Sequence, residues 1–205
     1  MKTFRATTSV TLWLTLTTLI LGITTLAFSQ GTEPHLRAFI RTSAWVATLL
    51  FSIAFATGPI TNWFERPWLI ALKIHRRKFG IGFATIMGLH LAALVLLGLE
   101  FPDPFLNGLG WVTILGGGAA YVCIAALALT SNDRAVHWLG RRRWQRLHTG
   151  CSWYIWIVLL QTYLSGESGA SLSGLFAALL IAVALLRITT SFKLMLQGRT
   201  LQNAD

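Results

Sequence analysis

The sequence predicts an all-α integral membrane protein, a bundle of six transmembrane helices with both termini in the cytoplasm. Hydrophobic residues make up 54% and charged residues only 12% of the 205 residues, and the mean hydropathy is +0.62. This composition leaves too little polar surface for a soluble domain of this length. The other two observations are a series of long apolar runs and the placement of basic residues on alternate loops. Together they make the lipid bilayer the first expected partner.

Six apolar runs are long enough to cross a bilayer. A helix needs about 20 mainly apolar residues to do so, because the hydrocarbon offers no water to open backbone groups. The first run follows Lys2 and Arg5 and lacks a convincing small-x-small cleavage site, so it predicts a retained helix rather than a signal peptide. The loops are short, so residues 1–205 are expected to form one compact domain. The expected helices are 8–28, 38–58, 79–99, 110–131, 147–165 and 173–191.

Three of the later apolar runs are distinguished by histidine or glycine residues. The third contains His90, and the fourth contains three consecutive glycines at 116–118, which allow another helix to approach closely. The fifth begins with Leu147 and His148 at the end of a basic loop.

The basic residues fall on alternate loops, with Arg37 and Arg41 as exceptions, whereas the intervening loops hold Glu33, Glu100, Asp103 and Glu167. Cytoplasmic loops carry an excess of Lys and Arg, so this pattern places both termini in the cytoplasm and makes the third and fifth helices run outward in parallel. The net charge of +10 does not indicate nucleic acid as a partner, because the basic residues form no face with interleaved aromatic residues. The predicted cytoplasmic basic residues are Lys2, Arg5, Arg66, Lys73, Arg76, Arg77, Lys78, Arg134, Arg141, Arg142, Arg143, Arg146, Arg187, Lys193 and Arg199.

His90 is the most informative residue, because it lies inside an otherwise uncharged span, where polar groups are expensive. One interpretation is an imidazole that bonds to a carbonyl of a neighbouring helix. The other is an axial haem ligand, since imidazole nitrogen binds iron well.

His148 lies at the predicted cytoplasmic edge, directly after the basic segment that contains Arg143 and Arg146. A haem held at this edge would turn its two propionates toward these guanidinium groups. Alternatively, the arginines only set the topology and contact lipid headgroups. His75 is predicted at about the same depth as His148, as an opposing ligand or as one more polar loop residue. His90 lies about 22 Å farther along the third helix than His75.

Two segments resemble a known family: "LALTSNDRAVHWLGRRRWQRLHTG" (127–150) and "HRRKFGIGFATIMGLH" (75–90). They are similar to the ferric reductase-like transmembrane domain, and closest to the MsrQ-like (YedZ-type) membrane haem subunits. The shared pattern is Arg-Arg-x-x-Gly with Leu-His ten residues later, then Thr-Ser and Leu-Gly-x-Arg-x-Trp-x-x-Leu-His. The similarity covers the second to the sixth expected helix.

The resemblance implies a haem b protein of the bacterial inner membrane that passes electrons outward, with His90 and His148 at family histidine positions. Two positions depart from the family pattern: Gln161 stands where a second histidine of the fifth helix is typical, and Arg76 stands where relatives carry a histidine. One haem is therefore favoured over two.

No Gly-rich dinucleotide fingerprint is present, so we expect an electron-transfer subunit rather than a self-sufficient oxidoreductase. Electrons would come from quinol or from the flavin of a separate partner protein. The alternative is a structural or assembly subunit of a larger respiratory or photosynthetic membrane complex that keeps the fold and has lost haem ligands.

Overall fold

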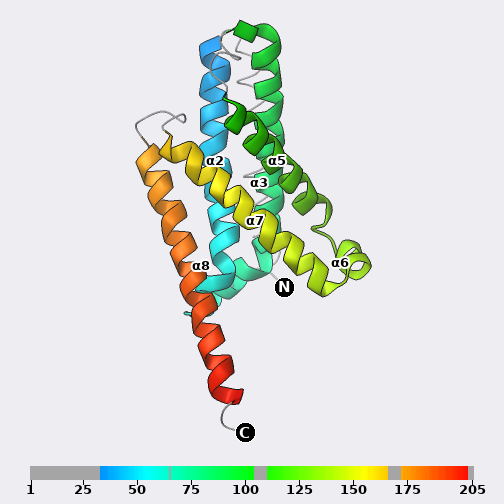
Figure 1. Cartoon of the computed structure of the whole chain (residues 1–205), viewed down its shortest axis with the longest axis vertical. Helices are drawn as coiled ribbons and strands as arrows, with labels where there is room; N and C mark the ends of the chain where they lie inside the picture. The colour runs from blue at the N-terminus through cyan, green and yellow to red at the C-terminus, as the bar shows by residue number, and fades with distance from the viewer. Residues whose placement is uncertain (1–32, 65, 104–109, 166–171, 203–205) are drawn as a thin grey trace.

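The computed structural model describes residues 33–64, 66–103, 110–165 and 172–202, and it shows helices and no strand among them (Figure 1). The all-α prediction is confirmed for this part of the chain. The expected first helix, 8–28, lies outside the described residues. The helices are α2 (Glu33–Ile60), α3 (Pro67–Glu100), α5 (Trp111–Leu129), α6 (Asp133–Leu139), α7 (Arg141–Leu164) and α8 (Ser173–Gln202).

Several helices are longer than the apolar runs that predicted them. Helix α3 begins at Pro67, well before the expected start at 79, and proline is favoured in the first helical turn because its missing N–H is not needed there. Helix α8 continues to Gln202 instead of ending near 191. The predicted bounds were too short because apolar content marks the part of a helix that suits lipid rather than its full length. The basic side chains at 73–78 therefore occupy fixed positions on a helix instead of a loop.

Three helices are long and apolar enough to cross a membrane, namely α2, α3 and residues Ser173–Gln197 of α8. A fourth is added if α5 and α6 count as one span, although their axes differ by 103°. Helix α7 is not in this set among the described residues, because its first turns hold four arginines and its later turns hold His148 and Gln161. The apolar helices suit a lipid bilayer, while the count of six crossings and the side of the termini stay predictions.

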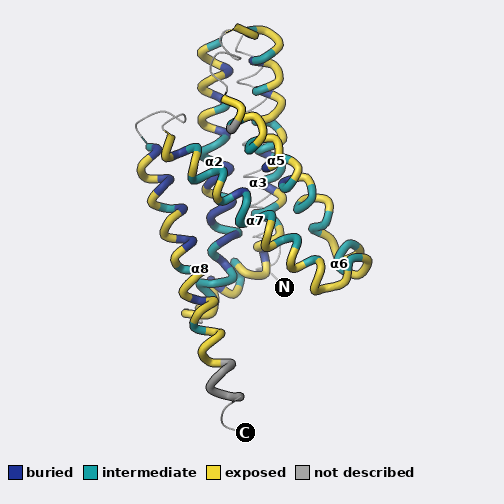
Figure 2. The backbone as a smooth tube through the Cα atoms, in the orientation of Figure 1, coloured by how far each residue is buried: buried dark blue, intermediate teal, exposed yellow. Residues whose placement is uncertain are grey.

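Helices α2 and α3 form a long antiparallel pair, with α8 along one side of α2 and α7 running obliquely between α8 and α6 (Figure 1). The buried positions gather where α2 faces α3 and α8, whereas the outer part of the α5–α6 arm and the lower end of α8 are largely exposed (Figure 2). The core contains Phe51, Phe55, Phe83, Ile155 and Leu180. Exposed leucines and isoleucines on the outer faces of α3 and α8 are expected where a helix contacts lipid rather than water.

Gly140 separates α6 from α7 and has a φ of +76°. This backbone conformation is open to glycine without steric cost. It lets α7 begin at Arg141, directly after α6, so that α7 folds back toward α5 and brings His148 beside Thr130.

Candidate cofactor site

A cavity of about 650 Å³ lies among α2, α3, α5, α6, α7 and α8. We call it the His148 cavity. Its apolar wall consists of Phe51, Ala54, Phe55, Ile74, Phe83, Ala84, Ile124, Leu127, Val136 and Trp144. Its polar wall consists of Lys73, Arg76, Arg77, Gly80, Ser131, Asn132, Asp133, Gln145, His148, Thr149, Ser152 and Arg187.

One face of helix α3 lines the cavity. Its lining residues are three or four positions apart, which places them on the same side of a helix; they include Lys73, Arg76, Gly80 and Phe83. A Cβ atom added at Gly80 would meet no other atom within 4 Å, so the helix backbone borders the open space directly. His75 adjoins Arg76 in the sequence, but it lies about 100° farther around the helix. It is buried, with 8% of its surface exposed, and it is not among the residues that line the cavity.

Arg187 of α8 also lines the cavity. Its guanidinium carbon lies 4.2 Å from the centre of the Phe55 ring and 5.7 Å from that of Trp153. Its Nη1 atom is buried and has no hydrogen-bond partner among the described residues. Arg187 as a whole is half-buried, but a buried donor of a cationic group without a partner is costly, so this guanidinium group is suited to receive an anionic ligand.

The other charged groups leave the cavity with a surplus of positive charge. Arg76 donates from Nε to the carbonyl oxygen of Ala54 at 2.7 Å, and this bond leaves its positive charge unpaired. Arg77 forms an ion pair with Asp133 at 3.3 Å. Asp133 is the one carboxylate among the lining residues, against four Lys and Arg side chains. The electrostatics of the cavity therefore favour an anion.

The tautomer of His148 follows from its hydrogen bonds. The Nε2 atom lies 2.9 Å from Thr130 Oγ1, and this hydroxyl donates its proton to the carbonyl oxygen of Ala126 at 2.6 Å. Because a hydroxyl has only one proton to donate, Thr130 must accept a hydrogen bond from His148 Nε2. The lone pair of the imidazole is then on Nδ1. The ring of Trp144 lies against the imidazole, with 4.1 Å between centroids.

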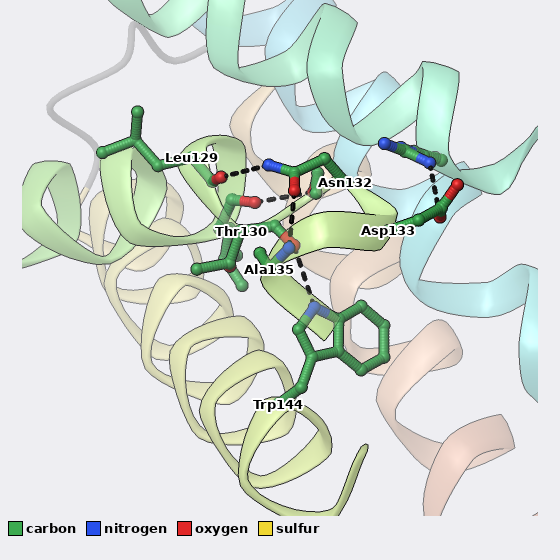
Figure 3. Close-up of polar contacts among 9 residues, drawn as sticks. Leu129, Thr130, Asn132, Asp133, Ala135 and Trp144 are labelled. Carbon is green, nitrogen blue, oxygen red and sulfur yellow. Dashed lines mark hydrogen bonds and ion pairs between the residues drawn. The ribbon is translucent and has the colours of Figure 1, made fainter. Parts of the chain in front are cut away.

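Thr130 is held by the bend between α5 and α6 (Figure 3). Asn132 donates from Nδ2 to the carbonyl oxygen of Leu129 and accepts from the backbone N–H of Ala135, both at 2.7 Å. Trp144 donates from Nε1 to the backbone carbonyl oxygen of Thr130 at 2.9 Å. These bonds fix the position from which Thr130 reaches His148.

Replacement of Asn132 by alanine is expected to lower the free energy of unfolding by about 1 kcal/mol, because the first turn of α6 loses its capping acceptor. Unfolding in mixed detergent and dodecyl sulfate micelles, followed by tryptophan fluorescence, measures the change. Asn132→Asp retains an acceptor for the Ala135 N–H and should lose less. Equal losses in the two variants would show that the cap contributes nothing.

His90 lies outside the His148 cavity. Its Nδ1 atom is 2.9 Å from Ser43 Oγ of α2, and Ser43 donates to the carbonyl oxygen of Ile40 at 2.9 Å. By the same proton count, His90 donates from Nδ1 and keeps its lone pair on Nε2. His90 follows the last lining residue of α3, Ala84, by six residues, which is about 9 Å along the helix. His90 and His148 are therefore not brought together at this cavity.

Arg143 and Arg146 lie on the first turns of α7, are exposed, and do not line the cavity. The cationic groups that do line it come from α3 and α8. Arg187 had no predicted role at the site, although a charged residue inside an apolar run was a usable signal. Arg76 was predicted only as a departure from a family pattern and not as part of a site.

No group of three or more His, Cys, Asp or Glu side chains in the described ranges could hold a metal ion. A porphyrin needs only one or two protein ligands for its iron, so the absence of such a group does not test haem binding. Comparisons with protein-family models, with curated proteins and with solved structures each found no match. The resemblance to ferric reductase-like proteins thus stays a prediction from the motifs.

Proposed function

We propose that this chain is a membrane electron-transfer protein that binds one haem b in the His148 cavity. The observation that carries the proposal is the combination of an imidazole, unpaired guanidinium groups and an aromatic wall in one cavity between helices. Its volume of about 650 Å³ lies within the range of sites that enclose a small molecule, roughly 300–1,000 Å³.

The residues present fit the chemistry of haem b, which is flat and apolar and carries two carboxylates. Arg187 and Arg76 would hold the carboxylates, and pairing with a carboxylate would satisfy the buried Nη1 atom of Arg187. His148 would bind the iron through the nitrogen that carries the lone pair. When bound, haem supplies one-electron redox chemistry.

The chain itself would orient the ligand and exclude water. Thr130 fixes the tautomer of His148 through the hydrogen bond at Nε2, as outer partners of metal-binding histidines do. Phe55 and Phe83 are both buried and form the apolar wall with Trp144. The open backbone at Gly80 leaves room for a flat ring system.

We place the protein in the bacterial inner membrane as a six-helix bundle with both termini in the cytoplasm. Quinol or the flavin of a separate protein would donate the electrons, and a separate partner would accept them on the outer side. His90 and its partner Ser43 lie outside the cavity, which favours one haem rather than two.

The direct test is the absorption spectrum of the full chain purified from haem-replete cells. We expect a reduced-minus-oxidised difference spectrum of a b-type haem and, by pyridine haemochrome quantification, one haem per chain. A colourless preparation without iron would exclude the proposal.

A second candidate is a structural or assembly subunit of a larger membrane complex. The observation in its favour is that His90 and His148 each have a hydroxyl partner within the protein, so both imidazoles are accommodated without a metal. This function predicts co-purification with other membrane subunits, and it predicts that His148→Ala leaves their association unchanged.

A further inference from the structure

The bend between α5 and α6 turns α6 away from the direction of the apolar helix before it. Helix α5 contains no charged residue, and its axis differs from that of α6 by 103°. When α5 lies across a membrane, α6 therefore lies close to the plane of the membrane surface. Asp133 at the start of α6 pairs with Arg77 of α3 at 3.3 Å, so α6 is at the level of the basic segment 73–78. Figure 1 shows α6 at the edge of the molecule, where α7 begins.

Three exposed arginines of α7, namely Arg142, Arg143 and Arg146, form a cationic surface that we call the Arg142 face. At about 100° per residue, they fall within about 100° of the helix circumference. The middle of this arc is about 150° around the helix from the middle of His148 and Ser152, which line the His148 cavity. The Arg142 face is therefore a separate surface from that cavity.

The Arg142 face has no anionic partner in the described part of the chain. The ion pairs found there lie elsewhere, within α2 and between α3 and α6. Arg142 and Arg146 are four residues apart on one helix, and like charges at this spacing repel each other. An anion from outside the chain would offset this repulsion.

Trp138 indicates the kind of surface that supplies the anion. It lies on α6, two residues before the start of the bend at Gly140, and 85% of its surface is exposed. Tryptophan is enriched where a membrane meets water, because its amphipathic ring suits the headgroup level. An acidic protein would also attract the arginines, but the direction of α6 and the exposed indole ring favour lipid headgroups.

We propose that the Arg142 face binds the phosphate groups of anionic phospholipids, while Trp138 anchors α6 at the same level of the bilayer. The planar guanidinium group presents paired donors that match the oxygens of a phosphate. The proposal does not depend on haem binding at the His148 cavity, and its test needs no haem.

The test uses the full chain purified in dodecyl maltoside and two lipids with the same acyl chains, phosphatidylglycerol and phosphatidylcholine. Binding is measured by the shift of the thermal unfolding midpoint as each lipid is titrated. We expect phosphatidylglycerol to bind at least about tenfold more tightly, and about 1 M salt should remove most of this preference. Arg142→Gln/Arg146→Gln should weaken phosphatidylglycerol binding roughly 10- to 30-fold, because each arginine near an anionic surface contributes about a factor of five. It should leave phosphatidylcholine binding unchanged.

Two paired variants are the controls. Arg142→Lys/Arg146→Lys keeps both charges and should keep most of the preference for phosphatidylglycerol. Arg37→Gln/Arg41→Gln removes two exposed arginines at the same four-residue spacing on α2, where Arg37 already pairs with Glu33. This second control should also keep the preference.

The proposal is overturned if the wild type binds both lipids equally, if Arg142→Gln/Arg146→Gln retains the preference, or if the α2 control loses as much of it. Trp138→Ser should weaken the binding of both lipids to the same extent, and unchanged binding would overturn the role of Trp138. Inorganic phosphate should not shift the midpoint, and a shift equal to that of the lipid would assign a free anion instead. An acidic protein that co-purifies with the wild type but not with Arg142→Gln/Arg146→Gln, without any lipid preference, would overturn the proposal in favour of a protein partner.

Discussion

Replacement of His148 by alanine is expected to lower the haem content of the purified protein at least about tenfold, because the cavity loses the nitrogen that we propose as the iron ligand. His148 is the one histidine among the residues that line the cavity. The haem per chain is measured by pyridine haemochrome quantification of variants purified in parallel. The reduced-minus-oxidised spectrum of any remaining haem reports whether its ligand has changed.

Two histidine variants serve as controls for this result. His137 lies on α6, is exposed and does not line the cavity, so His137→Ala should retain its haem. His90→Ala should also retain most of it, because His90 bonds to Ser43 outside the cavity. The opposite pattern, with loss of haem in His90→Ala and none in His148→Ala, would move the site to the other end of α3.

Replacement of Arg187 by methionine is expected to have opposite effects on the apo protein and on haem binding. Without haem, the variant should be more stable by about 1–3 kcal/mol, because it removes a half-buried guanidinium group whose buried Nη1 atom has no hydrogen-bond partner among the described residues. With haem, it should bind about 10- to 100-fold more weakly, because one charge-assisted hydrogen bond to a carboxylate is lost. Unfolding in dodecyl sulfate and haem titration into protein from haem-deficient cells measure the two effects.

Arg134→Met is the matched control, since Arg134 lies on α6, is exposed and does not line the cavity. It should change neither stability nor haem affinity. If Arg187→Met lowered the stability of the apo protein and left haem affinity unchanged, the packing of Arg187 on Phe55 would be its whole role. An anionic ligand would then have to bind elsewhere.

The positions of five helices could be predicted from hydropathy alone, because long apolar runs mark the segments that suit lipid. The ends of α5 were predicted to within two residues, but the starts of α3 and α7 and the end of α8 were not. Lys73 and Arg76 were expected in a loop, but nothing in their segment breaks a helix, and α3 extends over them. Helix α6 was also not predicted, because its seven residues are too few to give a periodic pattern.

Part of the candidate site could also be predicted. His148 was singled out because a histidine at the start of an apolar run is unusual, and it lines the cavity. Arg143 and Arg146 were chosen because they are close to it in sequence, whereas the cavity draws its guanidinium groups from Arg76 and Arg187. The partner of His148 at Nε2 is Thr130, the residue that follows the end of α5, and no sequence pattern specifies that bond.

The amino-acid sequence by itself determined that this chain is helical and suited to a membrane, since both properties depend on composition and on the lengths of apolar runs. Only the tertiary structure decided which charges share a cavity. Arg187 is more than a hundred residues from Arg76, and the two line one cavity because α8 packs along α2 and α3 lies on its other side. Residues in neighbouring sequence positions, such as His75 and Arg76, are separated by about 100° of helix rotation. Distant residues therefore share the cavity while a sequence neighbour does not line it, because helix packing turns only one face of each helix toward the cavity.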